Sequence, residues 1–228
     1  MSLARVRVLP LALGAVAIAV LIALGVWQVE RRAWKLSLIA QVERRLAAAP
    51  IAAPGPARWP TIGKDDAYTR VAAVGRYLPG ADTYTQATTD YGPGYWVMTP
   101  LDTGSWTLLI NRGFVPAAER GHHPAPTGVQ RVTGLLRVTE PEGGFLRSND
   151  PAADRWHSRD VSAIAARRGL TRVAPYFVDA DARGSGWPLG GLTVIRFPNN
   201  HLVYALTWFG LAALVAFLLA RSLRDDVD

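Results

Sequence analysis

The chain has 228 residues, half of them hydrophobic, and a formal net charge of +7. This length is short for two soluble domains, whereas it suffices for one domain with membrane anchors. The chain contains no cysteine, which excludes disulfides, cysteine-ligated zinc and thiol chemistry. The positive charge does not indicate nucleic-acid binding, because the basic residues are dispersed or lie at the edges of apolar segments.

The first expected element is a transmembrane helix at residues 8–29, preceded by a cytoplasmic N-terminus at residues 1–7. Residues 8–27 carry no charged side chain. At about 1.5 Å per residue, such a run crosses a hydrocarbon core of roughly 30 Å. A cleaved signal peptide has a shorter apolar region that is followed by small residues. Since this run is longer and continues into charged residues, we expect an uncleaved anchor.

The helical pattern continues beyond this span and predicts a helical extension at residues 30–49. Its apolar residues recur at three- and four-residue spacing, at Leu36, Ile39, Val42 and Leu46. Residues 51–60 are rich in Pro and Ala and have no clear period, which predicts a linker.

The central segment, residues 50–200, is expected to form a β-rich extracytoplasmic domain. Runs of β-forming residues bounded by turn signals predict strands at 68–77, 94–100, 107–111, 130–137, 176–179 and 192–197. One short helix is expected near residues 160–168, with Gly169 after its end. Several short strands of this kind indicate an antiparallel sheet or a small barrel. The predicted fold is a membrane α+β protein, with transmembrane helices at both ends.

The second transmembrane helix is expected at residues 201–220, followed by a cytoplasmic tail at residues 221–228. Basic residues lie outside the two spans, at Arg5, Arg7, Arg221 and Arg224. Positive charge favours the cytoplasmic side, so both termini are expected there and the central domain in the periplasm. Only seven residues precede the first span, which leaves no room for a mitochondrial transit peptide. The expected location is a bacterial inner membrane.

No familiar catalytic motif occurs, such as GxSxG, a P-loop, GxGxxG after a strand or HExxH. His122 and His123 are adjacent in a predicted loop without an evident third ligand, which favours exposed loop residues over a metal site. His157 is expected in a loop that leads into the short helix. A membrane-tethered enzyme would need a constellation of catalytic residues that cannot be located, so the sequence does not predict an enzyme.

The segment 111–116 is expected to have a structural role. Gly113 suits a tight backbone turn, Pro116 is expected to end a strand, and Arg112 to form an ion pair.

Aromatic and basic residues gather where the two apolar segments meet the expected membrane surface. In the second span His201, Tyr204 and Trp208 share a helix face, and in the first Trp27, Arg31 and Trp34 do so. An imidazole can ligate heme iron, aromatic rings can contact the macrocycle and cations can pair with its propionates. The cations available for this are Arg31, Arg32, Lys35 and Arg196.

An interfacial belt is the alternative interpretation of these residues. Trp and Tyr are enriched at membrane surfaces, and arginines commonly flank membrane helices. On pattern alone the belt is favoured. Three basic residues on the far side of the first span, Arg31, Arg32 and Lys35, nevertheless run against the expected orientation, which suggests that they serve another purpose.

A series of short motifs favours the heme interpretation. Residues 25–35 are GVWQVERRAWK, which is similar to a G-x-W-Q-x-x-R-x-x-W-K signature. Others follow in order at 68–71, 75–77, 94–100, 111–116, 149–151, 156–160, 176–180, 190–193, 199–204 and 207–210. Together they resemble the Surfeit-locus family of cytochrome c oxidase assembly factors along nearly the whole chain.

This resemblance implies a role in the maturation of oxidase subunit I by the handling of heme a. His201 corresponds to the family's histidine implicated in heme a binding, so it is the expected ligand of the heme iron. Helix spacing adds the expected cofactor contacts Tyr204, Trp208, Trp27, Arg31 and Arg32. The implied partners are subunit I, the heme a synthesis machinery and membrane lipid. A scaffold that stabilises an assembly intermediate without binding heme is the alternative.

Overall fold

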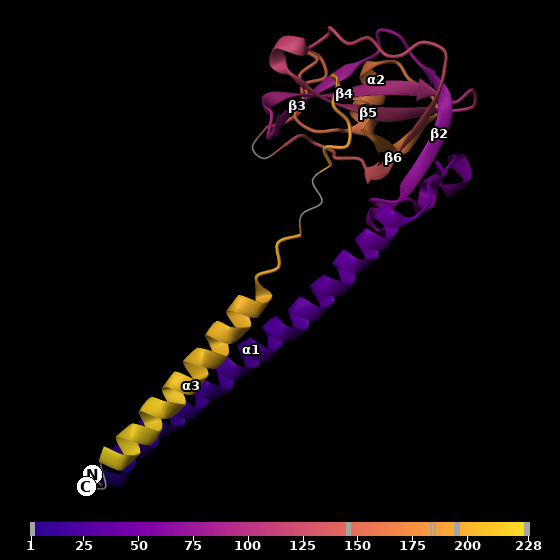
Figure 1. Cartoon of the computed structure of the whole chain (residues 1–228). Helices are drawn as coiled ribbons and strands as arrows, with labels where there is room; N and C mark the ends of the chain where they lie inside the picture. Colours follow the sequence, from indigo (N-terminus) through magenta and orange to yellow (C-terminus); the bar gives the residue numbers. More distant parts are fainter. Residues whose placement is uncertain (1–2, 145–146, 183, 185, 194–196, 226–228) are drawn as a thin grey trace. The chain divides into compact units, whose positions relative to one another are not determined.

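The computed structural model describes residues 3–144, 147–182, 184, 186–193 and 197–225. The chain divides into two compact units (Figure 1). One unit is helical and comprises Met1–Gln41 together with Ile195–Asp228. The other, Val42–Val194, is rich in β-strands.

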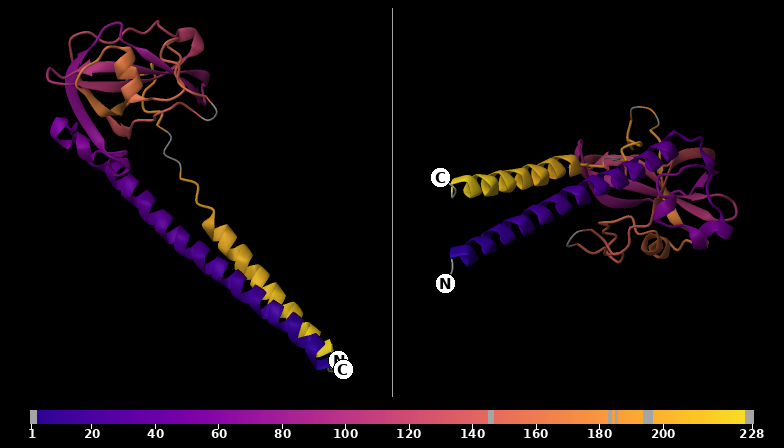
Figure 2. Two further views of the ribbon diagram at one scale, coloured as in Figure 1. Left: turned by 180° about the vertical axis from the view of Figure 1, so that it is seen from behind. Right: turned by 90° about the horizontal axis from the view of Figure 1, so that it is seen from below.

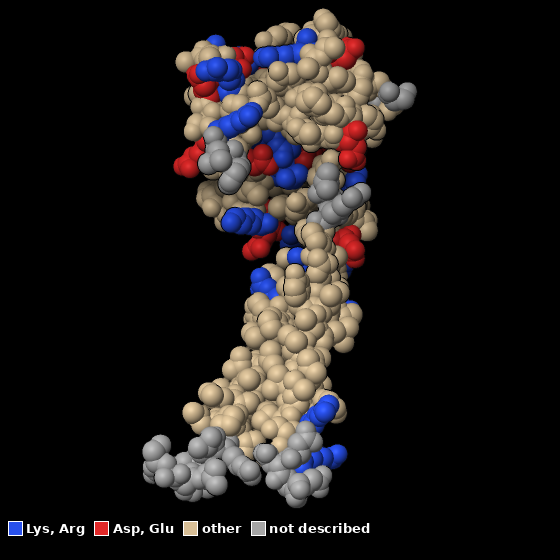
Figure 3. Space-filling view, turned by 90° about the vertical axis from the view of Figure 1, so that its left-hand side faces the viewer, with Lys and Arg blue, Asp and Glu red and all other residues tan. Residues whose placement is uncertain are grey.

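The helical ends are α1 (Leu3–Ala47) and α3 (His201–Asp225). Each includes a stretch that is long and apolar enough to cross a membrane. The side chains of these stretches are mostly exposed, and one face of the pair shows no charged residue along its middle (Figure 3). Exposure of such an extended apolar surface to water is unfavourable, whereas its exposure to lipid is not. The two helices therefore indicate anchoring in a membrane.

The β-rich unit is a small barrel with two added strands. Its strands are β1 (Ile51–Ala52), β2 (Arg70–Tyr77), β3 (Thr83–Thr89), β4 (Gly92–Asp102), β5 (Thr107–Pro116), β6 (Val129–Val138) and β7 (Val173–Ala180). The sheet order is β1-β2-β6-β7-β5-β4-β3, and a further pairing between β2 and β4 closes five strands into a barrel. This confirms the predicted fold class. Two of the pairings, β5–β7 and β1–β2, are parallel.

Four short helices complete this unit: η1 (Pro56–Thr61), η2 (Lys64–Asp66), η3 (Ala117–Glu119) and α2 (Val161–Arg167). The helix expected at 160–168 is thus present. The Asp160 side chain caps it by accepting a hydrogen bond from the Ala163 backbone N–H at 3.1 Å. Gly169 follows with a φ of +63°, the left-handed conformation typical of a residue after a helix.

Alternation along the strands divides the buried side chains between two cores. Leu108 and Ile110 of β5 pack inside the barrel, whereas Leu109 between them packs on the outer face. In that outer core Leu109 and Phe177 of β7 are covered by Ile164 of α2. Because these strands are buried on both faces, their sequences are continuous apolar runs.

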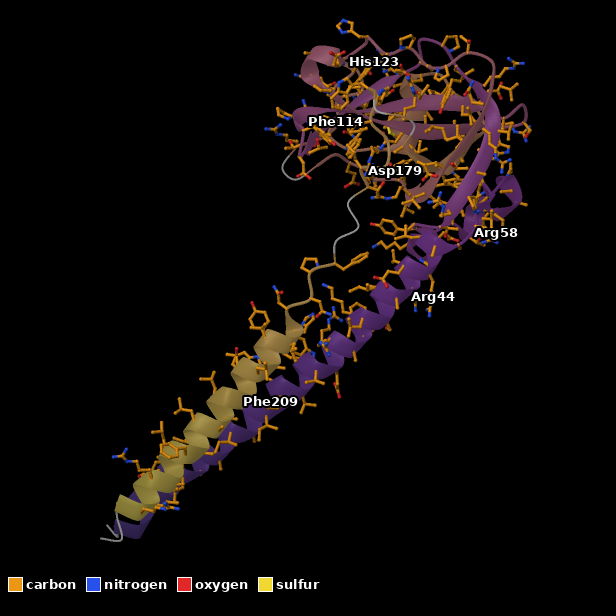
Figure 4. All side chains as sticks on the ribbon, in the orientation of Figure 1. Arg44, Arg58, Phe114, His123, Asp179 and Phe209 are labelled. Atoms are coloured by element: carbon orange, nitrogen blue, oxygen red, sulfur yellow. The ribbon has the colours of Figure 1, made fainter. Side chains whose placement is uncertain are left out.

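A buried carboxylate, Asp179 of β7, links neighbouring strands (Figure 4). Its Oδ1 accepts hydrogen bonds from Asn111 Nδ2 at 2.8 Å and Arg159 Nη1 at 3.1 Å. Its Oδ2 accepts from Arg137 Nη1 at 2.8 Å and Thr193 Oγ1 at 2.9 Å. Asp179 is only 5% exposed. Four donors, two of them cationic, therefore compensate for its removal from water.

Several local predictions are wrong. Residues 51–60 are not a linker, because they contain β1 and most of η1. The segment is held to the barrel by Tyr176, whose hydroxyl donates to the Pro54 carbonyl at 2.8 Å. Burial raises the pKa of Tyr176, so this hydroxyl keeps its proton. Strand β3 was not predicted. Of the strand expected at 192–197, residues 192 and 193 are not in a strand, and 194–196 lie outside the described residues.

Two of the three features predicted for the 111–116 segment are present, and the third needs a correction. Arg112 forms an ion pair with Asp82 at 3.7 Å, and Pro116 ends β5. Gly113, however, lies within the strand and not in a turn. Its φ is +132°, and a Cβ there would clash with the backbone of Leu189, which pairs with Phe114. Glycine is therefore required by the close approach of two backbones.

Replacing Asp179 by Ala should destabilise the barrel strongly. Loss of one partner from a buried ionic cluster typically costs about 3–5 kcal/mol, since Arg137 and Arg159 stay charged without their shared carboxylate. Denaturant unfolding of the detergent-solubilised chain, followed by tryptophan fluorescence, measures this loss. Asp150→Ala, which removes the exposed pair with Arg155, is the control. Equal unfolding midpoints for the two variants would contradict the assigned role of Asp179.

Candidate functional site

Helices α1 and α3 run antiparallel and touch along one face of each (Figures 1 and 2). Gly25 of α1 packs against the ring of Phe209, where an added Cβ would clash. Gly14 meets Leu219 in the same way. On α3, Ala205 is buried to 2% exposure. Small residues let the backbones approach closely, and the contact face is hereafter called the seam.

His201 and Gln28 meet across this seam. His201 is the first residue of α3, and its Nδ1 lies 2.7 Å from Oε1 of Gln28 on α1. Gln28 is 9% exposed, and His201 is half-buried. Among the described residues, no group forms a hydrogen bond with the second ring nitrogen of His201, Nε2. One side of the imidazole is thus held by the protein and the other is available to a ligand.

Trp27, Arg31 and Trp34 form a stripe on α1 beside Gln28. Each residue advances about 100° around a helix, so this stripe lies roughly a quarter turn from Gln28 and farther from Gly25. Trp27 and Trp34 are 53% and 51% exposed. The guanidinium of Arg31 stacks over the Trp34 ring at 3.9 Å. A stacked guanidinium can still direct its N–H groups toward a carboxylate.

Tyr204 on α3 turns toward the same side of the seam as this stripe. The two helices run in opposite directions, so the turn from His201 to Tyr204 leads to the same side as the turn from Gln28 to Arg31. Tyr204 is 54% exposed, whereas Trp208 is half-buried near the seam. We call the side formed by Trp27, Arg31, Trp34 and Tyr204 the aromatic flank.

Arg32 lies elsewhere. One position along the helix from Arg31, it is turned by about 100°, so it lies one turn beyond Gln28 on the face of the seam and not on the aromatic flank. Lys35 is half-buried on α1. Arg196, also considered as a propionate partner, lies outside the described residues. Of the cations considered, Arg31 is thus placed on the aromatic flank.

The groups along the seam fit the requirements of a heme. Nε2 of His201 can supply an axial lone pair, Tyr204 and Trp27 offer exposed rings, and Arg31 can pair with a propionate. All of these groups lie on two adjoining helices within one unit. To bind one heme together, these groups would have to contact it from the same side of the helix pair.

The other histidines have local roles in the β-rich unit. His123 Nε2 lies 2.8 Å from Oε2 of Glu119, and His122 is exposed beside it in a loop. His157 precedes the capped helix α2, as predicted, and lines an open hollow of about 470 Å³ together with Arg147. In the described part of the chain, no three His, Asp or Glu side chains are grouped to hold a metal ion.

Gln28 was not among the predicted site residues. A signal for it existed, because an amide next to an uncharged membrane-spanning run is costly unless it has a partner. The sequence could not identify that partner, which is 173 positions away.

Comparison with known proteins places the chain among a group of relatives. A model described as the SURF1 family matches residues 15–213, a range that includes Gln28 and His201. Surfeit locus protein 1 of Rattus norvegicus is 34% identical over 223 aligned residues, covering 87% of this chain and 71% of the relative. The human protein of that name is 34% identical, with coverage of 86% and 71%. A SURF1-like protein of Drosophila melanogaster is 30% identical, with coverage of 88% and 73%.

Cysteine cross-linking tests the seam, and the chain has no native cysteine to interfere. With Gly25→Cys and Phe209→Cys combined, a short thiol-reactive linker should join α1 and α3, because these positions pack against each other. Val26→Cys with Phe209→Cys is the matched control, since Val26 is 46% exposed and turned away from α3. Similar cross-linking yields for both pairs would show that the helices do not pack in this way.

Proposed function

Because the chain belongs to the SURF1 family, whose members are known as cytochrome c oxidase assembly factors, we propose that it handles heme a during maturation of oxidase subunit I. The observation that supports this most is the pairing of His201 with Gln28. It holds a histidine at the start of a membrane helix with one ring nitrogen available. The chain then acts as an assembly factor and not as an enzyme.

Each residue of the proposed site has a distinct task. When bound, heme a supplies the redox-active iron that the oxidase requires. Nε2 of His201 would ligate the heme iron, and Arg31 would pair with a propionate near the membrane surface. Trp27 and Tyr204 would contact the macrocycle from the two helices, with Trp208 closer to the seam.

The openness of the aromatic flank suits transfer more than storage. Resident small-molecule sites typically enclose about 70–90% of their ligand. Here the ring-bearing side chains are about half exposed, so another membrane protein can approach the ligand from the lipid side. The proposed partners are accordingly oxidase subunit I and the machinery of heme a synthesis, in contact with membrane lipid.

The alternative is a scaffold that stabilises an oxidase assembly intermediate without binding heme. The exposed apolar faces of α1 and α3 would support that role equally well. Purification of the protein from a heme a-producing host, followed by its absorption spectrum, separates the two functions. A heme-free wild-type protein from such a host would favour the scaffold.

We further propose a bacterial inner membrane, with both termini in the cytoplasm and the β-rich unit in the periplasm. The flanking Arg221 and Arg224 support this orientation. A reporter enzyme that works only in the periplasm should be active when it is fused at residue 120, in the loop after η3. Activity of a cytoplasm-specific reporter at this position would contradict the proposed orientation.

His201→Ala should remove most of the bound heme a while leaving membrane insertion intact. Alanine has no lone pair for iron, yet it is tolerated at the end of a membrane helix. Heme a per polypeptide and the absorption spectrum of the purified protein measure the effect. Tyr204→Phe retains the ring and should lose much less. A wild-type spectrum in His201→Ala would refute the ligand assignment.

Arg31→Gln should lower heme occupancy about fivefold, because an exposed ion pair contributes up to roughly 1 kcal/mol. Arg32→Gln is the matched control, since it removes an equal charge at the next position along α1, which is turned by about 100° away from the aromatic flank. Heme a titration of the two solubilised variants gives the comparison. An equal loss in both would mean that general positive charge, and not a contact on the aromatic flank, attracts the propionates.

A further inference from the structure

The hydrogen bond between Gln28 and His201 has a chemical direction. An amide oxygen carries no proton and can only accept, so with Oε1 facing Nδ1 the proton must reside on Nδ1. In a neutral imidazole the remaining lone pair is then on Nε2. The arrangement thus selects the tautomer whose outer nitrogen can bind a metal.

Without the hydrogen bond to His201, burial of the Gln28 amide would cost free energy. Gln28 is 9% exposed and follows apolar turns of α1, and a buried amide is unfavourable without hydrogen bonds. A leucine of similar size would fill the seam without this cost. The seam also has contacts independent of Gln28, between Gly25 and Phe209 and between Gly14 and Leu219.

Helix association alone is a weak reason for the amide. Measured hydrogen bonds between membrane helices change association by only about threefold on average. By contrast, a partner on the second nitrogen of a metal-ligating histidine typically changes metal affinity by about 10–100-fold. Orientation of His201 as a metal ligand therefore has the larger expected effect on affinity.

We propose that Gln28 is a positioning residue that fixes His201 as the Nδ1–H tautomer and orients Nε2 so that it could ligate heme iron. This inference rests on the proposed heme function. The neutral amide suits the task, because it accepts a hydrogen bond without adding a charge that would favour the doubly protonated ring, which has no lone pair. Gln28 itself does not touch the iron.

The first test needs no heme. Nitrogen-15 NMR of the full chain in detergent, labelled at its four histidines and assigned with His201→Ala, reports which ring nitrogen carries the proton. His201 should show a protonated Nδ1 and an unprotonated Nε2. In Gln28→Leu it should revert toward the Nε2–H form that free imidazole side chains favour. A protonated Nε2 in the wild-type chain would overturn the proposal without any variant having to fold.

The second test is titration of the solubilised chain with purified heme a. Gln28→Leu should bind about 10–100-fold more weakly than wild type, with a shifted spectrum of the axially ligated iron. Thr207→Val is the control, because the Thr207 hydroxyl donates within α3 to the Val203 carbonyl. Wild-type affinity in Gln28→Leu would overturn the inference. If His201→Ala also bound like wild type, the proposed heme site would fail as well, whereas NMR would still decide the tautomer.

Discussion

A polar group that is withdrawn from water must find its partners within the protein, and both units of this chain are arranged around that requirement. In the β-rich unit Asp179 receives four donors, from β5, from β6, from the segment before α2 and from the segment after β7. In the helical unit the amide of Gln28 receives His201. Each polar group specifies which elements must adjoin, because a different pairing would leave it unsatisfied.

The two cases differ in how completely the polar groups are satisfied. Both oxygens of Asp179 have two donors, so this carboxylate has no acceptor capacity left. The His201–Gln28 pair satisfies one ring nitrogen and leaves the other without a partner among the described residues. A side chain that ligates a metal needs both a fixed orientation and a free lone pair. The helical unit is therefore the better candidate for the functional site, although the β-rich unit contains more polar side chains.

Sequence patterns predicted those features that depend on neighbours along the chain. Strands such as β5 were found because apolar runs bounded by turn residues are local signals, and α2 because Asp160 and Gly169 mark its ends. Strand β3, with the sequence TYTQATT, has few apolar residues and is specified by pairing with β4. Gly113 was assigned to a turn because its requirement for glycine arises from Leu189, which is distant in sequence. Likewise, helix spacing grouped Trp27 with Arg31 and His201 with Tyr204, whereas Gln28 emerged only once the two helices were placed together.

The position of His201 at the first residue of α3 links the anchor to the proposed chemistry. A ligand that is apolar over most of its area but carries carboxylates requires lipid on one side and water on the other, and a helix end at the membrane surface offers both. A histidine deeper in α3 would bring the propionates into hydrocarbon, where an unpaired charge is very costly. One farther out would leave the macrocycle in water. With a single protein nitrogen, one flanking arginine and half-exposed rings, the proposed site would hold heme a less completely than an enclosed pocket does. Incomplete enclosure favours release to a partner that surrounds the same ligand on all sides, which is the requirement for a protein that delivers a cofactor and does not keep it.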